Sequence, residues 1–141
     1  MPIIRDDGFH VDDLNHGFTP IDALPANGPL AVDIAPDADL APLLARLDEA
    51  VAIRIAFPSF ADGRGFTIAR TLRRAGYAGR LRAAGHVIAD QYAMARRAGF
   101  DEVEIDDALA ARQPEAQWRA RADWRAHDYQ ARLGRRADIP A

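Results

Sequence analysis

The apolar positions in the middle of the chain switch between the spacing of a strand and the spacing of a helix. Four segments have the pattern of short strands: residues 30–34, 50–57, 80–84 and 102–105. Three intervening segments carry the apolar stripe of a helix: residues 40–47, which Asp37 or Asp39 could cap, 66–75 and 87–98. Glycines end the last two helices, at Gly76 and Gly99. This rhythm predicts a parallel sheet built from βαβ units with right-handed crossovers.

The two ends of the chain carry other patterns. Residues 3–11 predict an antiparallel hairpin, because apolar residues flank a turn at Asp6–Gly8. A loop rich in proline and glycine separates this hairpin from the first parallel strand. Pro114 begins a predicted C-terminal helix that carries Trp118 and Trp124.

The predicted parallel strands have one apolar and one polar face. The apolar face carries Val51, Ile53, Ile55, Leu81, Ala83, Val103 and Ile105. The polar face carries Arg54, Arg80, Arg82, Glu102 and Glu104 among alanines. Strands covered by helices on both sides would be apolar on both faces, whereas units added in one direction keep their helices on one side. We therefore expect an α/β fold with a singly wound parallel βαβαβ sheet, partly like a βα barrel, with the N-terminal hairpin and the C-terminal helix.

The polar face of this sheet has two interpretations. Its arginines and glutamates could form a solvated cross-strand charge ladder. Alternatively, the hairpin, the C-terminal helix or a second subunit covers them, and a second subunit would make the protein a homo-oligomer. The alternation along the strands leaves both interpretations open.

The chain has 141 residues, of which 49% are apolar and 28% charged, as expected for one globular domain. We expect residues 1–133 to form a single α/β domain and residues 134–141 to form a flexible tail. The absence of cysteine excludes disulfides, thiolate metal sites and a cysteine nucleophile. No apolar run approaches the roughly 18 residues of a membrane span, and the N-terminus lacks a signal-peptide pattern, so a cytoplasmic protein is expected.

The net charge of −3 hides an uneven distribution along the chain. Residues 1–50 carry ten acidic residues and two arginines, whereas residues 51–100 carry nine arginines and two acidic residues. All 18 basic residues are arginines, which excludes a Schiff-base lysine and a P-loop lysine. Nucleic-acid binding is disfavoured, because the net charge is negative and aromatic residues do not interleave with the central arginines.

Residues 57–67 join the carboxyl end of a predicted strand to the start of a helix, which is where ligands bind in α/β sheets. Gly63 and Gly65 would let the backbone approach an anion, and Arg64 adds a planar fork of donors. We therefore predict a small-oxyanion site at these three residues. Asp62 could hold the turn or act as a base, and a purely structural turn would need the same residues.

The next junction between a strand and a helix contains His86, which would lie at the same edge of the sheet. His86 could act as a general acid or base beside Arg64, or could simply be solvated. Asp90 suits the positive end of the following helix. Four residues near the N-terminus are of metal-binding types: His10, Asp12, Asp13 and His16. Their irregular spacing does not match a metal site, so no metal is expected.

Several runs of the sequence match the pattern of one bacterial family. They are Phe57-Pro58-x-Phe60-x-Asp62-Gly63-Arg64-Gly65, Ala69-Arg70, Leu72-Arg73, Leu81-Arg82-Ala83, Asp90-Gln91 and Arg96-Arg97-x-Gly99-Phe100. On these residues the chain resembles the family catalogued as domain of unknown function 934. It departs from the pattern at Ser59, Phe66, His86 and Ala98. The resemblance implies a gene beside that of the haem subunit of assimilatory sulfite reductase, and the label of a probable oxidoreductase in sulfite reduction.

Three functions are compatible with these residues. The first is an accessory protein of assimilatory sulfite reduction or sulfur assimilation, which binds a small oxyanion or a partner enzyme such as the haem subunit of sulfite reductase. The second is a small oxidoreductase-like or acid/base enzyme that uses Asp62–Gly65, and the third is a structural interaction module.

The accessory protein is the function that we expect. An oxidoreductase needs an electron carrier, whereas this chain has no cysteine and no complete dinucleotide fingerprint, so no cofactor is expected. Exposed arginines would supply the contact with a partner, and the candidates are Arg73, Arg74, Arg96 and Arg97.

Overall fold

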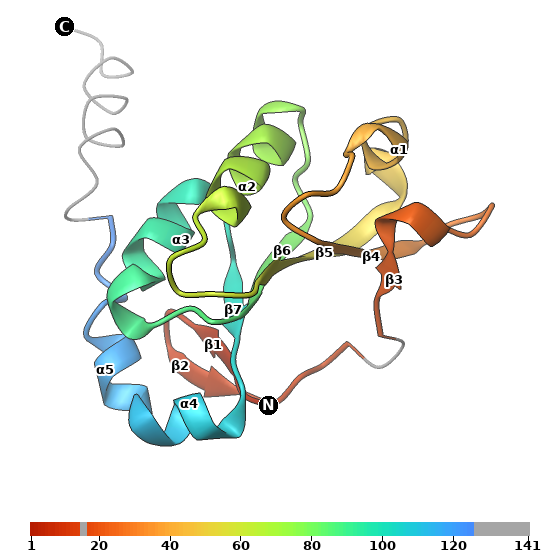
Figure 1. Cartoon of the computed structure of the whole chain (residues 1–141). Coiled ribbons are helices and arrows are strands. Elements are labelled where there is room, and N and C mark those ends of the chain that lie inside the picture. The colour runs from red at the N-terminus through yellow and green to blue at the C-terminus, as the bar shows by residue number, and fades with distance from the viewer. Residues whose placement is uncertain (15–16, 126–141) are drawn as a thin grey trace, which may run out of the picture.

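A seven-stranded sheet forms the centre of the protein (Figure 1), seen in a computed structural model that describes residues 1–14 and 17–125. Its strands are β1 Ile3–Arg5, β2 Gly8–His10, β3 Thr19–Pro20, β4 Leu30–Ile34, β5 Ala50–Phe57, β6 Arg80–Gly85 and β7 Glu102–Glu104. They lie side by side in the order β2-β1-β7-β6-β5-β4-β3. Strands β3 to β7 are parallel neighbours, whereas β1 pairs antiparallel with both β2 and β7. The predicted βαβαβ unit and N-terminal hairpin are therefore confirmed.

The helices between the parallel strands lie on one face of the sheet (Figure 1). They are α1 Ala41–Leu44, α2 Arg64–Arg74 and α3 Tyr92–Ala98. Each parallel strand is added beside the previous one, so the sheet is singly wound, as predicted. Strands β2 and β3 are its two edges, so the barrel-like part of the prediction is not confirmed. No helix in the described residues is long and apolar enough to cross a membrane.

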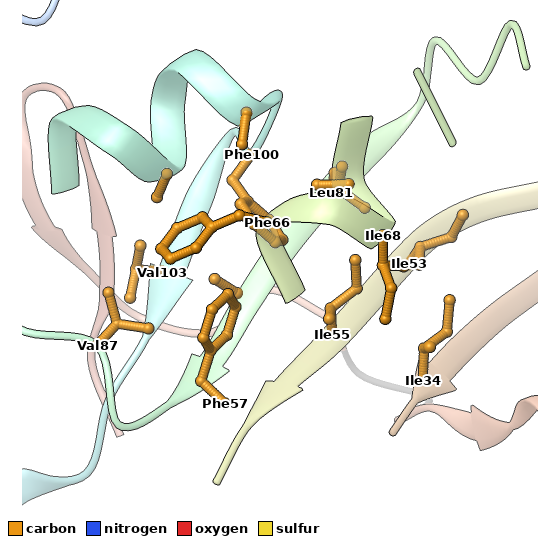
Figure 2. Packing of buried hydrophobic residues seen from close by; sticks show 14 of the residues in the cluster. Ile34, Ile53, Ile55, Phe57, Phe66, Ile68, Leu81, Val87, Phe100 and Val103 are labelled. Carbon is orange, nitrogen blue, oxygen red and sulfur yellow. The ribbon is translucent and has the colours of Figure 1, made fainter. Parts of the chain in front are cut away.

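The helix-covered face of the sheet carries the hydrophobic core (Figure 2). Ile53 and Ile55 of β5 are fully buried there. Beside them, the ring of Phe57 packs against Phe66 with centroids 5.0 Å apart and against Phe100 at 5.7 Å. These aromatic contacts join the end of β5 to α2 and to the segment after α3, so the core fixes the carboxyl edge of the sheet.

Val51 is predicted on the apolar face, but its side chain is exposed. The pairing between β4 and β5 shifts at this point, because Leu30 lies opposite Ala50 and the next residue, Ala31, lies opposite Ala52. The extra residue in β5 is Val51, and this bulge turns its side chain away from the core. The prediction was wrong at this position because strict alternation does not anticipate a bulge.

The helix expected over residues 40–47, with Asp37 or Asp39 as its cap, is much shorter in the structure. Only α1 is α-helical, and a 3₁₀ turn at Leu47–Glu49 follows it. Arg46 leaves the helical conformation, with φ −136°, and donates a hydrogen bond to the carbonyl oxygen of Pro25 at 2.7 Å. This tertiary contact accompanies the early end of the helix, and of the four spaced leucines only Leu43 is fully buried.

Two helices follow the sheet: α4 Asp107–Arg112 and α5 Glu115–Arg119. Further 3₁₀ turns in the described residues are Ile21–Ala23 and Ala89–Gln91. The α4 helix is not predicted, although the Asp106 carboxylate caps it by accepting a hydrogen bond from the Leu109 amide at 2.7 Å. The α5 helix is the predicted C-terminal helix and buries Trp118, but Trp124 lies beyond its end. The predicted tail, residues 134–141, lies outside the described residues.

A segment between β2 and β3, residues 11–14 and 17–18, crosses the polar face of the sheet, and we call it the N-terminal strap (Figure 1). Its contacts are Asp12 with Arg82 at 3.2 Å, Asp13 with Arg80 at 2.8 Å, and the Phe18 ring with the Arg54 guanidinium at 4.3 Å. Arg82 is only 1% exposed beneath the strap. The solvated ladder is therefore the wrong interpretation for the centre of this face, which an unforeseen element covers.

The charged residues under the N-terminal strap form a continuous network. Glu102 accepts hydrogen bonds from three arginines: Arg5 at 3.0 Å, Arg80 at 2.7 Å and Arg82 at 3.1 Å. Glu104 accepts one from Arg82 at 2.7 Å and contacts Arg54 at 3.3 Å, and Arg54 pairs in turn with Asp33 at 2.6 Å. No buried side-chain nitrogen or oxygen in the described residues lacks a partner. The network satisfies its buried charges across neighbouring strands.

The N-terminal strap should contribute stability that acid removes. A hydrogen bond from Arg80 lowers the pKa of Asp13 below its ordinary 3.8 in the folded protein. A lowered folded pKa stabilises the fold fully above the unfolded pKa, and this contribution is lost as the pH falls below about 4. We therefore expect Asp13→Asn to lower the urea midpoint at neutral pH and to flatten its fall on acidification. The effect should be small, because Asp13 is half-exposed.

Urea unfolding between about pH 3 and pH 7 measures this acid dependence. Asp48→Asn is the matched control, because Asp48 is exposed in the 3₁₀ turn before β5 and forms no hydrogen bond or salt bridge with the N-terminal strap in the described structure. Parallel pH profiles for the wild type and Asp13→Asn would contradict the ionic attachment of the strap.

Candidate functional site

Two connections meet at the carboxyl edge of the sheet: residues 58–63 between β5 and α2, and residues 86–88 after β6. The His86 amide donates a hydrogen bond to the carbonyl oxygen of Phe57 at 2.8 Å. Its Nδ1 lies 2.6 Å from the carbonyl oxygen of Pro58, which can only accept, so Nδ1 carries the hydrogen in this contact. The two predicted site segments therefore lie together, and the Nε2 atom of neutral His86 is left as an acceptor.

Asp62 and Arg64 form a closed pair at the start of α2. One carboxylate oxygen of Asp62 accepts hydrogen bonds from the Arg64 amide at 3.1 Å and from its Nε at 3.0 Å, and the other accepts from Nη2 at 2.8 Å. The Arg64 side chain remains 59% exposed. The hydrogen bond from Arg64 lowers the pKa of Asp62, which makes this carboxylate a weaker base.

The two glycines beside Arg64 have different surroundings. A side-chain carbon on Gly63 would meet no atom within 4 Å, so this residue leaves the start of α2 open to solvent. A carbon on Gly65 would lie 2.5 Å from Cζ of Phe57. Gly65 thus has a packing reason to be glycine, because the helix approaches the Phe57 ring too closely for a side chain. Of the two, only Gly63 has room for an anion beside it.

His86 and Gln91 hold the connection after β5 in place. The exposed ring of His86 packs at a tilt against Phe60, with centroids 5.1 Å apart. The Gln91 amide donates to the carbonyl oxygen of Phe60 at 2.9 Å and accepts from the Ile88 amide at 3.0 Å. This role of Gln91 was not predicted from the sequence. Its position three residues after Ile88, where a capping side chain is common, was the available signal.

The remaining candidate residues are engaged elsewhere. Asp90 pairs with Arg121 at 2.7 Å. His10 pairs with Asp7 at 2.5 Å, whereas Asp12 and Asp13 belong to the N-terminal strap, and His16 lies outside the described residues. Within residues 1–14 and 17–125, no group of three or more histidine, aspartate or glutamate side chains is arranged to hold a metal ion.

A hollow of about 600 Å³ opens at the same edge, on the polar side of the sheet. Ala56 and Ala84 line it together with Asp33, Arg54 and Glu104. Arg54 donates to Asp33 at 2.6 and 2.8 Å, so its planar fork is already filled. Two carboxylates face one guanidinium, and this balance disfavours an oxyanion in the hollow.

The arginines at the ends of α2 and α3 divide into two kinds. Arg74 and Arg97 are exposed, as expected. Arg73 and Arg96 are not, because their guanidinium groups bind backbone carbonyl oxygens of neighbouring segments. The expectation that all four offer a free positive charge was therefore wrong for Arg73 and Arg96.

Comparison with known proteins identifies one family. A family model with the description "Bacterial protein of unknown function (DUF934)" matches residues 31–139, which include most of β4, all of β5, β6 and β7, and the Asp62–Arg64 pair. No curated protein matches the chain, and no solved structure does.

Proposed function

The chain belongs to this DUF934 family, and from that premise we propose that it is a cytoplasmic accessory protein of assimilatory sulfite reduction, which binds a small oxyanion and a partner enzyme. The earlier resemblance favours the haem subunit of sulfite reductase as the partner. One observation carries the oxyanion part of the proposal. Three donors of Arg64 converge on a single carboxylate at the exposed start of an eleven-residue helix.

The Asp62 carboxylate occupies the position that an external oxyanion would take. Its two oxygens receive the amide, Nε and Nη2 hydrogens of Arg64, the same set of donors that sulfite, sulfate or phosphate would need. Gly63 leaves this position open to solvent. An incoming anion must displace the Asp62 carboxylate or share the donors with it, so we expect modest affinity.

Arg64→Ala should weaken the binding of sulfite and sulfate about tenfold to a hundredfold, because a hydrogen bond to a charged group contributes roughly 1.5–3 kcal/mol. Asp62→Asn should strengthen binding, since asparagine keeps an oxygen for the Arg64 amide while removing the competing negative charge. Isothermal titration calorimetry measures both affinities. Arg112→Ala is the control, because Arg112 is exposed on α4, away from the site. Equal affinity in the wild type and Arg64→Ala would remove Arg64 from the site.

An acid/base enzyme is the second candidate function, and one observation favours it. The Nδ1 contact of His86 fixes the ring and leaves Nε2 as a surface acceptor at the edge that also holds Arg64. This alternative predicts turnover that His86→Gln abolishes, whereas the accessory protein should show no turnover of sulfite or nicotinamide. A visible absorbance band from a stoichiometric flavin or haem in the purified protein would favour an oxidoreductase instead.

A further inference from the structure

We propose that the outer face of helices α2 and α3 is a docking surface for an acidic patch on a partner protein. We call it the arginine face, and it consists of Arg70 and Arg74 on α2 and Arg97 on α3. The proposal deepens the partner-binding half of the proposed function and rests on it, but it is independent of the oxyanion site at Arg64.

Each of the two helices ends in a pair of arginines, and in each pair the first points inward. Arg73 donates to the carbonyl oxygen of Gly99 at 2.7 Å and to that of Tyr77 at 2.9 Å. Arg96 donates to the carbonyl oxygen of Phe100 and to the Asp6 carboxylate at 3.1 Å. These inward arginines satisfy carbonyl groups near the ends of the two helices.

The second arginine of each pair points outward. Consecutive helix positions are about 100° apart, so Arg74 and Arg97 cannot share the contacts of their neighbours. Both are exposed, as is Arg70 one turn before Arg74. Nine arginines form salt bridges within the described part of the chain, and these three are not among them. Residues 1–14 and 17–125 therefore leave their charge available to a partner.

Two exposed apolar side chains lie on α3 or at its start. Met94 is 46% exposed on α3, one turn before Arg97. Phe60 is 41% exposed and is held against the start of α3 by the hydrogen bond from Gln91, three residues before Met94. Exposed apolar side chains together with arginines are typical of protein interfaces.

The positive charge of the arginine face indicates which kind of partner would bind there. Three acidic residues near it are engaged: Asp62 with Arg64, Asp90 with Arg121 and Asp101 with Arg73. Asp48 lines a hollow with Ala75 and Gly76 at the end of α2 and is exposed. Three guanidinium groups without a salt bridge in the described residues, with Met94 one turn before Arg97, complement glutamates or aspartates that flank an apolar side chain on a partner. A nucleic acid would need a longer basic track, because phosphate binding accumulates over many contacts.

The test compares two matched double variants. Arg74→Glu/Arg97→Glu reverses two charges on the arginine face, and Arg112→Glu/Arg119→Glu makes the same change on the exposed surface of α4 and α5. The probe is a fluorescent amphipathic helical peptide with leucines at positions i, i+3, i+4 and i+7 and glutamates between them, followed by anisotropy. We expect the first variant to bind at least about tenfold more weakly and the second to bind like the wild type, with affinity falling steeply as salt is added.

Several outcomes would overturn the proposal. Equal losses of peptide affinity in the two double variants would show non-specific attraction. No binding of the peptide by the wild type would show that the arginine face is not a docking surface. A single-stranded oligonucleotide that binds more tightly than the peptide, and through Arg74 and Arg97, would assign the face to nucleic acid. Self-association at low salt that Arg74→Glu/Arg97→Glu abolishes would assign it to a second copy of the chain.

Two further measurements keep these results interpretable. Circular dichroism and thermal unfolding should show that both double variants keep the fold, because all four arginines are exposed. Sulfite titration of Arg74→Glu/Arg97→Glu should match the wild type, since Arg64 is intact. If the protein binds sulfite but not the acidic peptide, only the docking role of the arginine face is refuted. If it binds the peptide as expected but not sulfite, only the oxyanion site is refuted.

Discussion

Replacing Arg82 by alanine is expected to lower the free energy of unfolding by about 3–5 kcal/mol, the cost of breaking a buried ion pair from one side. The Arg82 side chain is 1% exposed, and it donates to Glu102 at 3.1 Å and to Glu104 at 2.7 Å. Both carboxylates are themselves buried. Without Arg82, the two carboxylates would remain close together and poorly solvated, with fewer hydrogen-bond donors. The folded state would therefore lose free energy of stabilisation.

Urea or guanidinium unfolding at neutral pH measures this loss. Arg112→Ala is the control and should change the free energy by no more than about 0.5 kcal/mol, because Arg112 is exposed. Arg82→Lys should fall between the two, since lysine keeps the charge but not the planar fork that reaches both glutamates. A loss below about 1 kcal/mol for Arg82→Ala would contradict a desolvated network beneath the N-terminal strap.

The parallel sheet could be predicted because its signals are local. The alternation of β5 and the glycines after the helices depend on residues a few positions apart, and tertiary packing did not override them. Where packing did intervene, the prediction failed. Arg46 reaches Pro25, 21 positions away, and the helix around Leu43 ends early. Val51 is displaced by a register shift that only the partner strand reveals.

The N-terminal strap could not be predicted from local patterns. The contact between Asp12 and Arg82 spans 70 positions, and that between Asp13 and Arg80 spans 67. A weak signal was nevertheless present in the charge distribution. The acidic excess of residues 1–50 and the basic excess of residues 51–100 match each other, since acidic residues from the first half reach arginines of the second: Asp6 to Arg96, Asp12 to Arg82, Asp13 to Arg80 and Asp33 to Arg54.

At the candidate site, the sequence indicated the edge of the sheet but not the contacts within it. The pairing of Asp62 with Arg64 depends on the turn geometry, which the sequence does not specify. The orientation of the paired arginines, however, was readable. Four positions before Arg73 and Arg96 lie Ala69 and Tyr92, both buried, so the helical period already placed these two arginines next to the core.

Gly85→Ala is the second substitution for which we expect a large effect. Gly85 has φ +116°, a backbone conformation that side chains disfavour. A side-chain carbon there would also lie 2.6 Å from the carbonyl oxygen of Phe57, the same oxygen that accepts the His86 amide hydrogen. Strained backbone costs about 1–3 kcal/mol, and overpacking adds about 1–3 kcal/mol, so the free energy of unfolding should fall by roughly 2–6 kcal/mol.

Gly76→Ala separates these two contributions. Gly76 has φ +103°, but a side-chain carbon there would meet no atom within 4 Å, so this variant should lose only the backbone part. The difference between the two variants, about 1–3 kcal/mol in urea unfolding, measures how tightly β6 is pressed against the end of β5. That contact positions His86 and the connection that carries Asp62 and Arg64. Equal losses of unfolding free energy in Gly85→Ala and Gly76→Ala would mean that Gly85 does not approach the Phe57 carbonyl oxygen closely. The edge of the sheet would then not hold the candidate site.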